Sequence, residues 1–294
     1  MKIRHWAIWV SICLGICLCA VGAFAGNKSV CSGLPGQASL KSALVSAVAQ
    51  NNGGLGFNMW ATLVGNDGTV CAVAFSGGQF TDQWLASRVI SAQKASTASA
   101  LSLGTDANMP SGSVFQHGLA LSTANLYSAV QPGGTLYGLQ HSNPVDPTIA
   151  YQGNSNAFGT ANDPLVGQRV GGVNVFGGGL ALFASGGIKV GGLGVSGDTS
   201  CTDHAVAWRV RNTLGLDHFG SSGTAVAGVS GDADRPDNII HDFSSAAEGG
   251  ILNPNGTGTL SGTQVTSTSG FGHPDCLAGK GEISPSSLPA VQHN

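Results

Sequence analysis

The sequence has little charge, since only 9% of its 294 residues are Asp, Glu, Lys or Arg. Twelve basic residues stand against 15 acidic ones, and no run of basic residues occurs. Nucleic-acid binding needs a positive surface that neutralises phosphates, so we expect no DNA or RNA partner. The 46 glycines indicate many turns, in a chain that is still long enough for one sizeable core.

Long apolar runs are also scarce, and the clearest one lies at the N-terminus. It spans Trp6–Ala20, follows a basic start and precedes the small-x-small sequence Ala23-Phe-Ala25. This pattern predicts a secretory signal peptide over residues 1–25 and not a membrane anchor. Its removal would leave ten basic residues against fifteen acidic ones, a net charge near −5. We therefore expect a periplasmic or extracellular protein that has no membrane anchor after processing.

Closely spaced cysteine pairs are missing, because no C-x-x-C occurs among the four cysteines that would remain after processing. Zinc or thioredoxin-like chemistry therefore has little support. An even number of cysteines in an exported chain predicts disulfides, and three pairings are possible. We favour Cys31–Cys71 with Cys201–Cys276, because the second bond would tie the tail to the start of a core helix.

Local patterns predict an order of helix, hairpin, long helix, short helix, hairpin and helix. Asp67-Gly68 is a strong hairpin signal between two strand-like runs, and the Ala- and Ser-rich face of the long helix would allow a sheet to approach closely. Helices are expected near Leu40–Val48 and over Asp82–Leu103, Leu121–Val130 and Thr202–Leu214. Strands are expected over Phe57–Val64, Thr69–Phe75, Gly172–Ala184 and Ile188–Val195.

Paired hairpins favour an α+β fold with an antiparallel sheet flanked by helices. The segment 217–294 differs, because it is rich in Gly, Ser, Thr, Asn and Pro and has few apolar runs. Such a segment buries little surface by itself. We therefore expect an irregular C-terminal extension wrapped on the core.

Two ordered motifs resemble those of the GlcG/HbpS-like, haem-degrading family. The first is Gln93-Lys-Ala-Ser-Thr-Ala98, and the second is Leu193-Gly-Val-Ser-Gly197 followed by Asp203. The family's Gly-Gly-x-Pro strand entry is matched only in part, since Ala181 stands in place of the proline. The resemblance implies a profilin-like α/β domain over residues 26–216, with a five-stranded antiparallel sheet and assembly into homo-oligomers.

Family members are associated with haem, so the resemblance implies an exported protein that handles or senses haem outside the cytoplasm. Haem, or another small anionic ligand, would then contact Lys94, Thr97, Gly197, Asp203 and His204, and His204 could ligate the iron. Other interpretations stay open for these residues. Lys94 could be solvated or paired with a carboxylate, and Thr97 could bond to the carbonyl four residues earlier. Asp203 could be a carboxylate in the first helical turn that interacts with the helix dipole, and His204 could be a surface residue.

No catalytic constellation is visible. G-x-S-x-G is absent, and the glycine-rich pieces Gly171-Gly172 and Gly177-Gly178-Gly179 do not form G-x-G-x-x-G between a strand and a long helix. A non-catalytic oligomeric module is the alternative function, with Arg209 and Arg211 pairing with acids across a subunit contact or simply solvated. An enzyme acting on a small organic acid at Gly194–Asp203 is a weaker alternative. His241-Asp242 and His273-Pro-Asp275 could form a metal site, although no H-x-x-x-H spacing supports it.

Overall fold

The computed structural model describes residues 30–242, 267–277 and 283–294. The expected signal peptide lies outside them. The main sheet has four strands in the order β2-β1-β5-β4, and every neighbouring pair is antiparallel. The strands are β1 (Trp60–Gly65), β2 (Val70–Phe75), β4 (Gly179–Ala184) and β5 (Ile188–Ser196). This confirms an α+β fold built on two hairpins.

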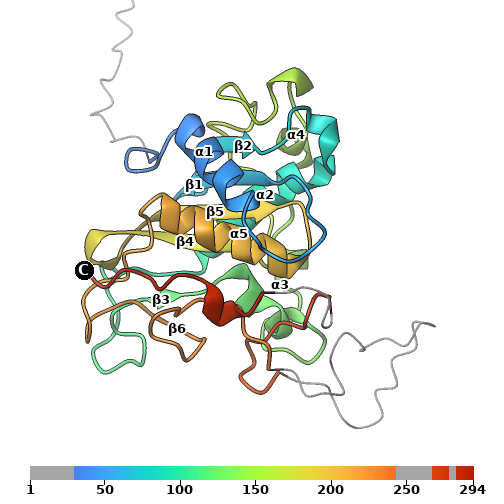
Figure 1. Cartoon of the computed structure of the whole chain (residues 1–294). Coiled ribbons are helices and arrows are strands. Elements are labelled where there is room, and N and C mark those ends of the chain that lie inside the picture. The colour runs from blue at the N-terminus through green and yellow to red at the C-terminus, as the bar shows by residue number, and fades with distance from the viewer. Residues whose placement is uncertain (1–29, 243–266, 278–282) are drawn as a thin grey trace, which may run out of the picture.

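Helices cover both faces of this sheet (Figure 1). The long helix α2 (Leu85–Ala100) packs on one face, whereas α1 (Gln37–Val48) and α5 (Ser200–Thr213) pack on the other. Helix α2 packs very close to the sheet because the strand beneath it, β5, has glycines on the side that faces the helix. A Cβ built on Gly194 would lie 1.9 Å from the Ser91 carbonyl oxygen. Small residues on the helix and glycines on the strand therefore set this interlayer distance.

The expected fifth strand of the sheet is not found in the described residues. Instead, β3 (Leu119–Ala120) and β6 (Ala227–Gly228) form a separate parallel pair. Short α-helices occur at α3 (Leu139–Ser142) and α4 (Pro147–Ala150). Single 3-10 turns span Phe80–Asp82, Thr123–Leu126, Ser128–Val130, Ser155–Ala157, Ser185–Gly187 and Pro285–Ser287.

Three expected elements differ from the structure, each for a local reason. The predicted helix over Leu121–Val130 is two 3-10 turns, because the Asn125 side chain bonds back to Ser122 and across to the tail. The strand expected from Gly172 begins at Gly179, since the Asn174 N–H bonds to the Thr97 hydroxyl and not to a strand neighbour. The first strand begins at Trp60, because the Leu55 and Phe57 N–H groups bond to the Asp198 carboxylate.

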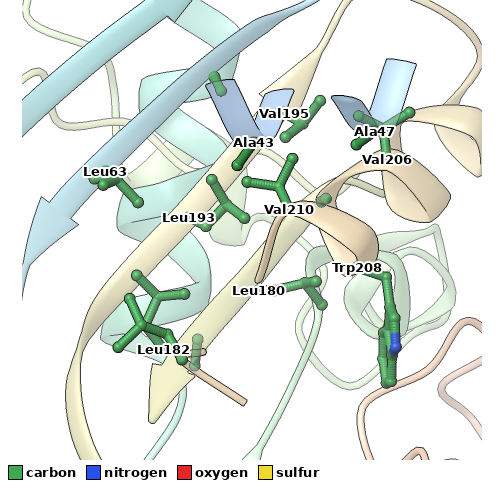
Figure 2. Close-up of a cluster of buried hydrophobic side chains, with 14 of the residues drawn as sticks. Ala43, Ala47, Leu63, Leu180, Leu182, Leu193, Val195, Val206, Trp208 and Val210 are labelled. Atoms are coloured by element: carbon green, nitrogen blue, oxygen red, sulfur yellow. The ribbon is translucent and has the colours of Figure 1, made fainter. Parts of the chain in front are cut away.

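The main hydrophobic core lies between the sheet and the α1/α5 layer (Figure 2). Strand residues such as Leu182 and Leu193 meet Val206 and Val210 of α5 there, and all four are fully buried. Described residues of the tail enter the same core, where Phe219, Val226, Leu288 and Val291 are buried and Ile283 is partly buried. The Trp208 indole N–H also donates to the Pro289 carbonyl at 2.9 Å. Tail residues therefore complete the core.

Both favoured disulfides are confirmed. Cys31 bonds to Cys71, with a Cα–Cα distance of 5.5 Å, and Cys201 bonds to Cys276, with a Cα–Cα distance of 6.0 Å. The second bond joins the tail to the first turn of α5, as expected. Within the described part of the chain, no helix is both long enough and apolar enough to cross a bilayer.

Candidate functional site

The two family-like motifs meet at one buried ion pair. Lys94, in the middle of α2, donates from Nζ to Asp203 Oδ2 at 2.7 Å and to the Val195 carbonyl at 3.1 Å. Lys94 belongs to the first motif, Val195 to the second, and Asp203 is the acidic residue that follows it. Lys94 is 1% exposed and Asp203 is 2% exposed. Of the interpretations left open for Lys94, pairing with a carboxylate of the same chain is therefore the one that its contacts match.

Asp203 also fixes the turn between β5 and α5. Its Oδ1 accepts the Asp198 N–H at 2.9 Å, while the Thr199 side chain caps α5 by accepting from the Thr202 N–H. The Gly197 carbonyl accepts from the Gln83 side-chain amide at 2.6 Å. The turn between β5 and α5 is therefore held by hydrogen bonds within the chain.

Burial dominates the electrostatics of the pair. It raises the pKa of Asp203 from 3.8 to about 6, although the Lys94 ammonium acts in the opposite direction. Burial also lowers the pKa of Lys94, which the Asp203 carboxylate partly counters. Each charge is stable in this environment because the other is present. A ligand carboxylate would have to displace Asp203 to reach the Lys94 ammonium.

Thr97 and His204 are also buried. The Thr97 hydroxyl donates to the Gln93 carbonyl at 2.7 Å, which is the expected i−4 bond, and it accepts the Asn174 N–H at 3.1 Å. His204 Nε2 lies 3.1 Å from Asn238 Oδ1 and 3.2 Å from the Ile239 nitrogen, so the surface interpretation is wrong. Burial lowers the pKa of His204 to about 3, which keeps the ring neutral at physiological pH.

A small cavity lies beside His204. Its volume is about 20 Å³, enough for roughly one water molecule. His204 Nδ1 is buried and has no hydrogen-bond partner among the described residues. The cavity is lined by Asn52, Cys201, His204, Ala205, Ile239, His241, Ile283, Pro285 and Leu288. It is far too small for a haem, so any large ligand must bind outside it.

A histidine cluster closes this region where the tail meets α5. His241 Nδ1 lies 3.1 Å from Asp275 Oδ1 and 3.0 Å from the His273 carbonyl oxygen, and its side chain is 24% exposed. His273 is buried, its Nδ1 donates to the Pro274 carbonyl at 2.7 Å, and its Nε2 accepts from the Ser200 hydroxyl at 2.7 Å. Burial lowers the pKa of His273 to about 3.

The sequence named these two histidine segments as a possible metal site, without assigning an acid to either histidine. Asp275 contacts His241, whereas Asp242 accepts the Ser269 N–H at 2.7 Å. The contact with Ser200 was missed altogether. The only available signal was the favoured Cys201–Cys276 bond, which brings His273 and Asp275 to the start of α5.

The expectation for Arg211 is wrong, because this side chain is fully buried inside the chain. It makes two hydrogen bonds to Asp237, at 2.6 and 2.9 Å. A guanidinium that is 0% exposed cannot pair with acids across a subunit contact. Arg209 donates to Asn52 and Gln50 side chains of its own chain, at 2.9 and 2.7 Å.

A larger cleft lies between loops of the tail, away from the predicted site. Its volume is about 580 Å³, within the range of small-molecule sites. Asp232, Asp234 and His293 supply its charged or titratable groups, and its other lining residues include Val226 and Pro236. Two carboxylates make this cleft unfavourable for an anionic ligand.

No family model matches the chain, and no curated protein matches it. Among solved structures, it is similar to the crystal structure of a PduOC–heme complex, with 24% identity over 60% of this chain and 90% of that one. It is also similar to the Klebsiella pneumoniae protein ORFY, described under the family model DUF336. That match has 21% identity over 60% of this chain and 88% of that one. Both matches have a TM-score of 0.38, too low to carry an argument about this chain.

Proposed function

We propose that the protein is an exported haem-binding protein of the GlcG/HbpS-like type, which handles or senses haem outside the cytoplasm. One observation carries the proposal: the motifs Gln93–Ala98 and Leu193–Gly197 are in direct contact, because Lys94 donates to the Val195 carbonyl and also to Asp203, the acidic residue that follows the second motif. Two disulfides support export, because such bonds persist in oxidising compartments. Residues 26–216 would form the profilin-like domain, and residues 217–294 its packed extension.

Buried Lys94, Thr97, Gly197 and Asp203 would support this site by holding the β5–α5 turn. The ligand contact itself requires an accessible group, and none of the four is exposed. His204, beneath the histidine cluster, would reach a metal only if the tail moved. In this proposal the five predicted site residues hold the fold beneath the binding surface and do not themselves contact the ligand.

His241 has the geometry of an iron-ligating histidine. Its Nδ1 faces the Asp275 carboxylate and the His273 carbonyl, which fixes the ring orientation. Its Nε2 has no hydrogen-bond partner among the described residues, and the side chain is partly exposed. A carboxylate on the far nitrogen makes an imidazole a stronger ligand. The haem would therefore lie on the surface at His241, with its iron bonded to Nε2.

Hemin titration of the oxidised, signal-free protein tests this function. We expect a shifted Soret band that His241→Ala weakens at least tenfold, while His141→Ala, at an exposed position, leaves it unchanged. An unchanged hemin spectrum at several-fold excess protein would refute haem binding. A normal Soret band in His241→Ala would refute only the assigned ligand.

An oligomeric interaction module is the second candidate, and one surface feature favours it. Leu55, Phe57 and Trp84 are 52%, 39% and 57% exposed, and the Phe57 and Trp84 rings meet edge to face at 5.5 Å. Exposed aromatic groups of this kind are typical of interfaces. This candidate predicts a defined homo-oligomer that Trp84→Ser dissociates, and a strictly monomeric protein in analytical ultracentrifugation would exclude it. The turn at Gly194–Asp203 holds only the chain's own groups, so no enzyme activity is proposed there.

A further inference from the structure

A second set of chemically reactive groups lies at the junction between α5 and the tail. Cys201 and Cys276 each offer a sulfur, His273 offers a ring nitrogen, and these three atoms lie within 4.8 Å of one another. The sulfurs are joined as a disulfide, and both cysteines are partly exposed, so a reductant can approach them. Haem binding at His241 makes no use of this set.

We propose that reduction of the Cys201–Cys276 disulfide creates a site for one thiophilic cation, with Zn²⁺ or Cu⁺ bound by two thiolates and His273. Two sulfurs and an imidazole nitrogen are the donors that these ions prefer over harder cations. The residues that the structure describes supply three ligands here, and water would take the fourth position of a tetrahedral Zn²⁺.

The backbone already has the spacing that such a site needs. Tetrahedral Zn²⁺ with Zn–S bonds of about 2.3 Å requires its sulfurs to be about 3.8 Å apart. The Cα atoms of Cys201 and Cys276 are 6.0 Å apart, so side-chain rotation can separate the freed sulfurs without moving the helix. His273 has an anchor that does not depend on the disulfide, because its backbone N–H donates to the Ile240 carbonyl at 2.7 Å, and Cys276 lies three residues further along the same segment.

The imidazole of His273 is already in the tautomer that a metal requires. Nδ1 donates to the Pro274 carbonyl, which leaves the lone pair on Nε2. That lone pair accepts the Ser200 hydroxyl at 2.7 Å in the disulfide form. The Tyr127 ring, 4.8 Å from the His273 ring centroid, limits rotation of the imidazole. The metal would therefore replace one hydrogen bond and use an orientation that the fold provides.

The reaction balances with a dithiol as the reductant. Two electrons and two protons pass from the dithiol to the Cys201–Cys276 bond, which gives two thiols while the reductant becomes a disulfide. The cation then binds and displaces both thiol protons, which leave to solvent. Disulfide and metal thus exclude each other, and either one links the tail to the first turn of α5. The fraction of chains that hold a metal ion would therefore depend on how reducing the thiols of the compartment are.

The test compares two double variants that each keep one cysteine pair. Cys31→Ser/Cys71→Ser retains the proposed ligands, whereas Cys201→Ser/Cys276→Ser retains a pair with no histidine among the described groups around it. Each protein is reduced with a dithiol, freed of it without oxygen, and titrated with Zn²⁺ against a chromophoric chelator. We expect one Zn²⁺ per chain in the first variant, none of that affinity in the second, and none in the oxidised wild type.

Two further measurements separate a built site from loose thiols. Co²⁺ should give thiolate-to-metal charge-transfer bands and intense tetrahedral d–d bands, and His273→Ala in the first variant should weaken Zn²⁺ binding at least tenfold. Circular dichroism before and after reduction checks the fold. Failure of the reduced first variant to bind, unfolding on reduction, or equal affinity with and without His273 would overturn the proposal. None of these outcomes bears on haem binding, which is measured on the oxidised protein.

Discussion

Replacing Lys94 with methionine is the sharpest test of how the two family-like motifs are joined. Methionine keeps the length and most of the volume of the lysine stem, so the change removes mainly the ammonium. Asp203 would then be a carboxylate that is 2% exposed, with the Asp198 N–H as its remaining donor. The Val195 carbonyl would lose its side-chain donor as well. Breaking a buried ion pair from one side costs about 3–5 kcal/mol.

That cost is large against the total stability of a folded domain, which is about 5–15 kcal/mol. The urea midpoint of Lys94→Met should therefore fall by about a fifth or more, with an unchanged slope. Asp203→Asn gives the matched partner, because asparagine still accepts from the Asp198 N–H. The double variant should be less destabilised than the sum of the two single variants, with a coupling of about 1–3 kcal/mol.

The stability difference between Lys94→Met and wild type should also depend on pH, which a simple loss of packing would not produce. Without the ammonium, the pKa of Asp203 should rise above its value of about 6, while the unfolded chain keeps a value near 3.8. Folding then takes up a proton at Asp203 between these values, which stabilises Lys94→Met as pH falls from 7.5 to 5, against the opposite effect of His204 and His273 that variant and wild type share. The deficit relative to wild type should shrink accordingly. A Lys94→Met protein within 1 kcal/mol of wild type, or a deficit that is independent of pH, would refute the assigned role.

Two further predictions follow from buried groups elsewhere. Gly194→Ala should cost more than about 2 kcal/mol of stability or prevent folding, since its Cβ would lie 1.9 Å from the Ser91 carbonyl oxygen. Gly33→Ala is the control and should be nearly neutral, because the space around Gly33 is open; equal urea midpoints of the two variants would contradict the close packing of α2 on β5. His204 and His273 have pKa values of about 3 in the fold and 6.5 when unfolded, so the unfolded chain binds more protons and stability should fall on acidification from pH 6.5. Asp203 has the opposite effect, because its raised pKa makes the folded chain bind one extra proton. The free energy of unfolding should therefore fall by about 1.4 kcal/mol for each pH unit between pH 6 and pH 4. A urea midpoint that stays constant over that range would refute the neutral state of both rings.

Local patterns predicted the regular elements well where sequence neighbours determine them. The hairpin at Asp67-Gly68 joins β1 and β2 as expected, and α2 has the close contact with the sheet that its small residues predicted. The favoured disulfide pairing was also right. Periodicity failed where side chains compete with the backbone, as at Asn125 and Asp198. A side chain that bonds to a distant N–H ends or shifts an element without leaving a periodic signal.

The candidate site could be predicted only in part, because its partners are far apart in the chain. Lys94 and Asp203 were both named, but their pairing spans 109 residues and no spacing rule connects them. Arg88 and Asp163 form another fully buried ion pair, which no local pattern predicted. His241 was named as a possible metal ligand, yet its orienting carboxylate, Asp275, became visible only with the tail in place.

The scarcity of charge in this chain has a structural counterpart. Among residues 30–242, 267–277 and 283–294, three ion pairs (Arg88–Asp163, Lys94–Asp203 and Arg211–Asp237) are buried, and each has its cation on a helix. In two of them, Arg88–Asp163 and Arg211–Asp237, the acid lies in irregular chain. Because a buried guanidinium tolerates only a well-placed carboxylate, these pairs select one position for a loop that hydrophobic contact alone would leave free to slide. Arg211–Asp237 and the Cys201–Cys276 bond fix the tail in this way at two points of α5. His241 and His273 lie on that fixed tail, so both proposed sites require it to be docked, and substitutions at Asp237 should impair them without touching either ligand set.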